Sequence, residues 1–159
     1  MKSLSILLAS AWLALGAVAA IAADSNENSV NGTWALNAAK SKFSGPGFKT
    51  QTRTYATTAD GTMTMSFTGT TSTGATVTGA SSFKYDGKDY PITGSTDFDM
   101  ISLKKINDST VNFWLKKGGA LVGEGSRMIG SHGKVLTVNA KVKGPDGKPY
   151  SSMMVYDRK

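Results

Sequence analysis

A regular alternation of apolar and polar residues constrains this chain more than any other feature of its sequence. The segment TMTMSFTGT at positions 62–70 places its two methionines and its phenylalanine on one face of an extended chain. Its threonines and its serine occupy the opposite face. After residue 23, no segment repeats apolar residues at helical spacing over three turns. The chain beyond that point is therefore predicted to be all-β.

Turn-forming residues divide this region into short segments at roughly 8–12-residue spacing. The predicted strands are Thr33–Asn37, Lys49–Thr57, Thr62–Thr70, Ala75–Tyr85, Asp89–Ile92, Phe98–Lys105, Thr110–Lys117, Ala120–Ser131, Val135–Lys143 and Tyr150–Tyr156. Each connection suits an antiparallel neighbour, and closing such a meander removes its exposed edges. The predicted fold is an antiparallel up-and-down β-barrel of about 8–10 strands, with a two-sheet sandwich as the alternative. The longer loop Ala38–Phe48 is expected to cover one end.

An apolar leader precedes the predicted barrel. Residues 1–23 combine Lys2, the apolar run Leu4–Ile21 and the sequence Ala20-Ile21-Ala22, which fits the A-x-A cleavage pattern. They are predicted to be a signal peptide cleaved after Ala22 or Ala23, with a retained membrane anchor as the alternative. The mature protein is then periplasmic or secreted. It comprises a disordered linker at 24–29 and a single β-barrel domain at 30–159.

The apolar face of the strands is expected to point inward. Adjacent lysines at 104/105 and 116/117 place charge on both faces of their strands, and the aromatic girdles of membrane barrels are missing from the sequence. We therefore expect no stable membrane insertion. The predicted lumen residues are Met63, Met65, Phe67, Val77, Phe83, Tyr85, Ile101, Leu103, Val111, Phe113, Leu115, Leu136, Val138 and Val155.

Two arginines in the middle of strands suggest a ligand site in that lumen. Parity places Arg53 on one face with Gln51 and Tyr55, and places Arg127 on one face with Leu121 and Ile129. A guanidinium group in an apolar lumen suits an amphipathic anion such as a fatty acid. The predicted ligand-binding residues are Arg53, Tyr55, Met65, Phe67, Phe83, Tyr85 and Arg127. In the alternative, Arg53 points to solvent and Arg127 packs over Trp34.

Catalytic chemistry is not predicted. The chain has no cysteine and one histidine, His132, which lies in a predicted turn. The carboxylates of Asp97 and Asp99 share a strand face and are better explained by solvation. We expect no enzyme activity, no catalytic residue, no metal site and no cofactor. The formal charge of +7 is dispersed, so nucleic acid is not an expected partner.

The triplet Gly32-Thr33-Trp34 resembles the G-x-W signature of lipocalins and their calycin relatives. That resemblance implies that the Trp34 ring plugs the closed end of the barrel beneath an arginine from a late strand, with Arg127 as the best-placed partner and Arg158 as the alternative. Further segments resemble a group of small exported bacterial proteins with a lipocalin-like fold and no established activity. These segments are Gly32–Phe43, Tyr85–Gly94, Leu103–Ile106 and the terminal YDRK.

The function predicted from these features is binding of a small apolar or amphipathic ligand, which the arginines would allow to be anionic. Tyr85, Tyr90 and Pro91 are candidates for a lip at the barrel mouth, or for ordinary hairpin residues. The alternative function is that of an envelope structural or interaction protein whose barrel is filled by its own side chains.

Overall fold

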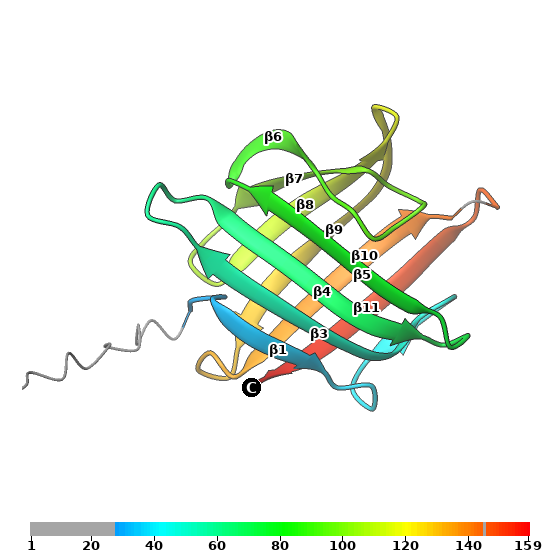
Figure 1. The fold of residues 1–159 in the computed structure, drawn as a ribbon, viewed down its shortest axis with the longest axis horizontal. Helices are drawn as coiled ribbons and strands as arrows, with labels where there is room; N and C mark the ends of the chain where they lie inside the picture. The colour runs from blue at the N-terminus through cyan, green and yellow to red at the C-terminus, as the bar shows by residue number, and fades with distance from the viewer. Residues whose placement is uncertain (1–27, 145) are drawn as a thin grey trace, which may run out of the picture.

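The computed structural model describes residues 28–144 and 146–159 (Figure 1). Its strands are β1 (Gly32–Leu36), β2 (Lys42–Phe43), β3 (Phe48–Thr57), β4 (Met63–Thr71), β5 (Thr76–Phe83), β6 (Asp86–Pro91), β7 (Met100–Lys105), β8 (Thr110–Lys117), β9 (Ala120–Gly130), β10 (Val135–Lys143) and β11 (Pro149–Arg158). Among the described residues, no helix is long and apolar enough to cross a membrane. The predicted signal peptide at 1–23, and residues 24–27 of the predicted linker, lie outside the described residues.

The strands form one antiparallel sheet that curves into a nearly closed barrel (Figure 1). From β3 to β5 and from β6 to β11, each strand pairs with the next one in the chain. β1 pairs with both β3 and β11, which closes one side of the barrel. Between β5 and β6 the sheet continues through the bridge Ser81–Ile92 and a 3.0 Å hydrogen bond from Thr93 N–H to the Ala80 carbonyl. The predicted up-and-down barrel is confirmed, and the sandwich alternative is wrong.

The interior of the barrel contains the apolar face that the alternation predicts. Met63, Met65 and Phe83 are all buried in it, and so are the apolar residues of β7, β8 and β10 that were expected there. Polar groups share this interior on β3, where Gln51 and Tyr55 are buried on the same face as Arg53. The core is therefore apolar on most strands and polar where β3 crosses it.

The expected facing of β11 is wrong at Val155. Met154 and Tyr156 belong to the core, whereas Val155 lies on the outer face beneath the turn that follows β1. In that turn the Asn37 N–H donates to the Val155 carbonyl at 2.8 Å, and the Val155 N–H donates to Ser41 Oγ at 3.0 Å. The four residues MMVY at positions 153–156 are all apolar, so the alternation of apolar and polar residues does not distinguish the two faces of β11.

The expected facing of β9 is wrong at Leu121. Leu115 pairs with Gly123 while Lys116 pairs with Leu121, so Val122 forms a β-bulge that reverses the parity of the preceding residues. Leu121 is consequently 60% exposed, whereas Arg127 and Ile129 face the interior as predicted.

The long loop at 38–48 contains the short strand β2, which pairs with β11 at Ser152 and Met153. Pro46 and Gly47 in the same loop line the open end of the barrel. The loop therefore borders one end of the barrel, and part of it extends the sheet.

Candidate functional site

One end of the barrel is closed around Trp34. The Trp34 side chain is fully buried, and its Nε1–H donates to the Val30 carbonyl at 2.8 Å. The Arg158 guanidinium lies 4.1 Å from the Trp34 ring centroid. It also donates to the carbonyls of Gly133, Asn31 and Ser29 at 2.6 Å each. These contacts fix the arginine over the indole ring, and together the two side chains plug this end of the barrel.

The assignment of Arg127 as the arginine over Trp34 is wrong, and the alternative, Arg158, is correct. Arg158 lies directly opposite Trp34 in the pairing of β1 with β11. Arg127 is on β9, where its register partner Val138 faces the interior of the barrel. Strand pairing, which could not be read from residue spacing, decides between the two arginines.

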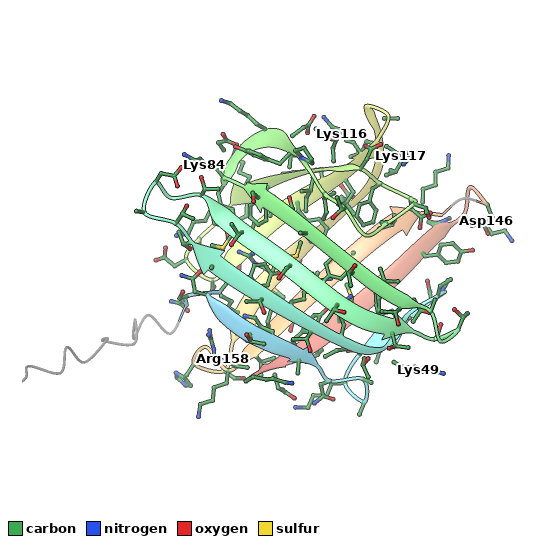
Figure 2. The ribbon with its side chains drawn as sticks, in the orientation of Figure 1. Lys49, Lys84, Lys116, Lys117, Asp146 and Arg158 are labelled. Atoms are coloured by element: carbon green, nitrogen blue, oxygen red, sulfur yellow. The ribbon has the colours of Figure 1, made fainter. Side chains whose placement is uncertain are left out.

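A cavity of about 510 Å³ occupies the remainder of the barrel interior. Its inner end contains Arg53, Tyr55, Phe83 and Arg127, and its walls are apolar residues of β4, β7 and β8. The opposite end opens between Gly94–Asp97 and the β10–β11 connection, near Gly144 and Tyr150. In Figure 2, Lys84 lies at the closed end and Asp146 beside the open end.

Arg127 is held at the inner end of the cavity by aromatic residues. Its side chain is buried, with 7% of its surface exposed. Its Nη2 donates to the Tyr85 hydroxyl at 2.5 Å. The guanidinium carbon lies 5.2 Å from the Tyr55 ring centroid and 5.4 Å from that of Tyr85. The positive charge thus rests between two ring faces, which attract cations.

Arg53 occupies an equivalent position on β3. Its Nε donates to Gln51 Oε1 at 2.8 Å, and the Tyr156 hydroxyl donates to the same oxygen. The guanidinium carbon lies 5.2 Å from the Tyr156 ring centroid and 5.7 Å from that of Phe67. Burial raises the pKa of Tyr156 to about 12, so this hydroxyl is a neutral donor near neutral pH.

The inner end of the cavity is electropositive. Among the described residues, neither Arg53 nor Arg127 forms an ion pair with a carboxylate. Burial by itself would raise the pKa of the Tyr55 hydroxyl, but the charges of Arg53 and Arg127 more than offset it and lower that pKa from its ordinary value. The polar partners of both arginines are neutral groups, so the positive charge is solvated but not neutralised.

The structure brings together most of the residues predicted to bind ligand. Arg53, Tyr55, Met65, Phe67, Phe83 and Arg127 all line the cavity. Tyr85 does not line the cavity itself. Its hydroxyl accepts a hydrogen bond from Arg127, which does line it. The sequence pattern does not identify Tyr156 as a partner of Arg53, because the apolar run MMVY conceals the facing of β11. Parity places Gln51 on the correct face but does not identify it as the hydrogen-bond acceptor for Arg53.

The proposed lip of Tyr85, Tyr90 and Pro91 is not at the mouth. This segment follows β5 at the closed end of the barrel, and the mouth is bordered by Gly94–Asp97 instead. Among the described residues, no group of three or more His, Cys, Asp or Glu side chains is arranged to hold a metal ion. His132 is exposed in the β9–β10 turn, with a φ of 53°.

No family model matches the chain, and no curated protein matches it. Its fold is similar to that of several solved barrels, among them the following two. The fluorescent protein UnaG matches with a TM-score of 0.54 at 14% identity, over 82% of this chain and 97% of UnaG. The S-type phycobiliprotein lyase CPES from Guillardia theta matches with a TM-score of 0.54 at 11% identity, over 84% of this chain and 89% of the lyase. At these identities the likeness concerns the fold alone, which is lipocalin-like.

Proposed function

We propose that the barrel binds a small amphipathic anion, with its apolar part in the cavity and its charged head group between Arg53 and Arg127. The observation that carries this proposal is the pair of guanidinium groups that face an apolar cavity without a carboxylate partner among the described residues. A monocarboxylate such as a fatty acid has the required chemistry.

Electrostatics supports an anionic head group. A buried charge without a counter-ion is unfavourable, even when neutral groups satisfy its hydrogen bonds. Arginine also presents a planar fork of donors that fits a carboxylate. An anion between Arg53 and Arg127 would therefore stabilise both side chains and gain two charge-assisted contacts.

The shape and lining of the cavity support an apolar tail. A volume of about 510 Å³ lies within the usual range for small-molecule sites, and it argues against a barrel filled by its own side chains. Ile101, Leu103 and Leu115 contribute apolar surface between the arginines and the mouth. A chain with its carboxylate at Arg53 and Arg127 would extend along this surface toward Gly94–Asp97.

The proposal includes export, because residues 1–23 have the pattern of a signal peptide. It also describes binding without catalysis. The barrel would hold or carry its ligand and release it unchanged.

The test compares dodecanoate with dodecanol, which has the same chain length but no charge. We expect dodecanoate to raise the melting temperature progressively with ligand excess, because it binds the folded state alone. Arg53→Gln and Arg127→Gln should each weaken dodecanoate binding more than dodecanol binding. Native mass spectrometry of the protein from its natural host would look for a co-purified acid.

Lys134→Gln is the matched control, since it removes one positive charge from an exposed position outside the cavity. It should leave dodecanoate binding unchanged. Absence of any melting shift at millimolar dodecanoate, or equal binding by all three variants, would overturn the proposal.

A further inference from the structure

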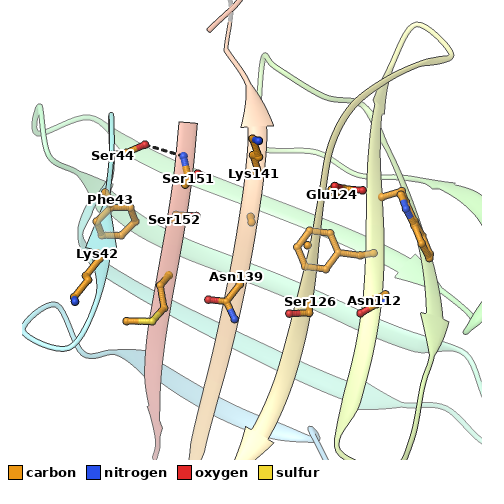
Figure 3. Close-up of a pocket in the computed structure, with 15 residues that line it drawn as sticks. Lys42, Phe43, Ser44, Asn112, Glu124, Ser126, Asn139, Lys141, Ser151 and Ser152 are labelled. Atoms are coloured by element: carbon orange, nitrogen blue, oxygen red, sulfur yellow. Dashed lines mark hydrogen bonds between the residues drawn. The ribbon is translucent and has the colours of Figure 1, made fainter. Parts of the chain in front are cut away.

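A second concave region lies on the outer face of the barrel. Figure 3 shows it across β8, β9, β10 and β11, with β2 along one side. Its volume is about 760 Å³. Asn112 lies in it between Val111 and Phe113, which are both buried in the core, so the groove is formed by the face opposite to the cavity. Most of its lining residues do not line the internal cavity, which shares only Phe113, Ser151 and Ser152 with it.

Polar side chains cross this groove in a first row. Asn112, Ser126 and Asn139 are register partners on β8, β9 and β10, and Met153 continues the row on β11. Figure 3 shows the first three side by side across their strands. Because neighbouring strands are about 4.8 Å apart, the four positions span on the order of 14 Å. The row is long enough for an extended ligand.

A second row lies two residues farther along each strand. Trp114, Glu124 and Lys141 are register partners on β8, β9 and β10. Trp114 is partly buried, so part of its indole surface faces the groove. The positive charge of Lys141 is opposite the negative charge of Glu124, and a second cation, Lys42, lines the groove on β2.

The polar groups of both rows are unused within the protein. Among the described residues, the side chains of Asn112, Ser126, Asn139, Glu124 and Lys141 have neither a hydrogen bond nor an ion pair. An amide both donates and accepts, as a hydroxyl group does. Two unpaired amides on the same face as a partly buried aromatic ring therefore suit a ligand with many hydroxyl groups and an apolar ring face.

We propose that this groove binds a linear, uncharged oligosaccharide. One sugar ring lies against the Trp114 indole, whose electron-rich face attracts the polarised C–H groups of the sugar. The hydroxyl groups of the adjacent units bond to Asn112, Asn139 and Glu124. The length of the row selects an oligosaccharide over a single sugar, and the carboxylate of Glu124 in the middle of the groove disfavours a polyanion.

The experiment measures binding of cellotriose, chitotriose and maltotriose by isothermal titration calorimetry. We expect saturable binding of at least one trisaccharide and much weaker binding of its monosaccharide. Trp114→Ala should weaken binding by about tenfold through loss of the stacked ring. Asn139→Ala, which leaves the aromatic surface intact, should weaken it by about fivefold. Each variant is first checked for an unchanged circular dichroism spectrum.

Two controls separate this site from the cavity and from general surface effects. Thr68→Ala alters an exposed outward residue on β4 and should bind the trisaccharide normally. Arg127→Gln should also bind the trisaccharide normally, because Arg127 lines the internal cavity and not the groove. Failure of the fatty-acid proposal would therefore leave this result unchanged. The proposal is overturned if no trisaccharide binds at millimolar concentration, or if Trp114→Ala binds as tightly as the wild type. It is also overturned if sedimentation shows a dimer that Trp114→Ala dissociates, because a second copy would then cover the groove.

Discussion

Trp34 and Arg158 hold the closed end of the barrel together, and their contact can be tested by truncating the indole ring. Removal of a fully buried aromatic side chain loses its apolar contacts and leaves a cavity. It would also leave Arg158 without its aromatic surface. We expect Trp34→Ala to lower the free energy of unfolding by about 3–5 kcal/mol, measured by urea denaturation.

Trp34→Phe is the matched variant for this measurement. It keeps an aromatic face for Arg158 but loses the 2.8 Å hydrogen bond from the indole to Val30. Its loss should be smaller than that of the alanine variant. A loss below about 1 kcal/mol for Trp34→Ala would contradict a plug at this end.

The sequence identified the important residue types of the site but not all their positions. The G-x-W triplet and the arginines in mid-strand were recognisable, and six of the seven predicted ligand residues line the cavity. The choice of Arg158 over Arg127 above Trp34 depends on the register between the first and last strands. That register joins residues from opposite ends of the barrel domain, so local periodicity contains no information about it.

Among the elements, the β3–β4 hairpin contains the most strongly perturbed carboxylate. The Thr58 hydroxyl donates to Asp60 Oδ1 at 2.5 Å and the Thr62 hydroxyl donates to Oδ2 at 2.7 Å. These bonds, with the Thr62 N–H and Lys84, hold the pKa of Asp60 well below its ordinary value. The unfolded chain therefore takes up a proton first as the pH falls. The stabilisation is present above about pH 4 and is lost below it.

We expect the melting temperature of the wild type to fall more steeply between about pH 5 and pH 2 than that of Asp60→Asn. Differential scanning calorimetry across this range measures the difference. Glu124→Gln is the control, because Glu124 has no side-chain partner among the described residues. Parallel curves for the wild type and Asp60→Asn would show that the hairpin bonds contribute nothing to stability.

The hydrogen bonds between Ala80 and Thr93 form a seam between β5 and β6, and this seam depends on the glycine at position 79. A Cβ added at Gly79 would collide with the Thr93 carbonyl oxygen and with the Phe67 ring. We expect Gly79→Ala to separate Thr93 from Ala80 and to lower the free energy of unfolding by about 1–3 kcal/mol. Hydrogen exchange should become faster at the amides of Ala80 and Thr93, which both donate hydrogen bonds across the seam.

Gly130→Ala is the control on β9, where an added Cβ meets nothing within 4 Å. It should leave exchange at the seam unchanged. Equal exchange rates at Ala80 in both variants would mean that the seam is not closed by this contact.

The elements themselves were largely predictable, because period-two alternation and turn residues are local signals. The errors at Leu121 and Val155 share one cause, which is that a face assignment holds only while the alternation is unbroken. A bulge at Val122 reversed the parity of β9, and a run of four apolar residues concealed that of β11. The short strand β2 was also missed, since its two residues pair with β11 and not with a neighbour in the chain.

For the molecule as a whole, an open cavity can be filled by substitution. Val77 on β5 is partly buried and lines the cavity, so a larger side chain there has space to enter it. We expect Val77→Trp to abolish dodecanoate binding while changing the free energy of unfolding by less than about 1.5 kcal/mol. Titration calorimetry and urea denaturation provide the two measurements.

Thr78→Trp is the control, because the adjacent side chain on β5 is exposed on the outer face. It should bind dodecanoate normally. Severe destabilisation of Val77→Trp alone would indicate that the barrel has no room for an added ring.

The pairing of β1 with β11 also governs how the chain reaches its native state. The side chains of Asn37 and Asp157, hydrogen-bonded at 2.7 Å next to this pairing, are 120 residues apart in the chain. The hairpins between consecutive strands can form from local segments. Closure of the barrel joins distant segments, so the chain loses conformational entropy before the new contacts compensate for that loss. Trp34 is buried by that closure. Its fluorescence is therefore expected to report the slow, rate-limiting step of refolding, after the consecutive hairpins have assembled.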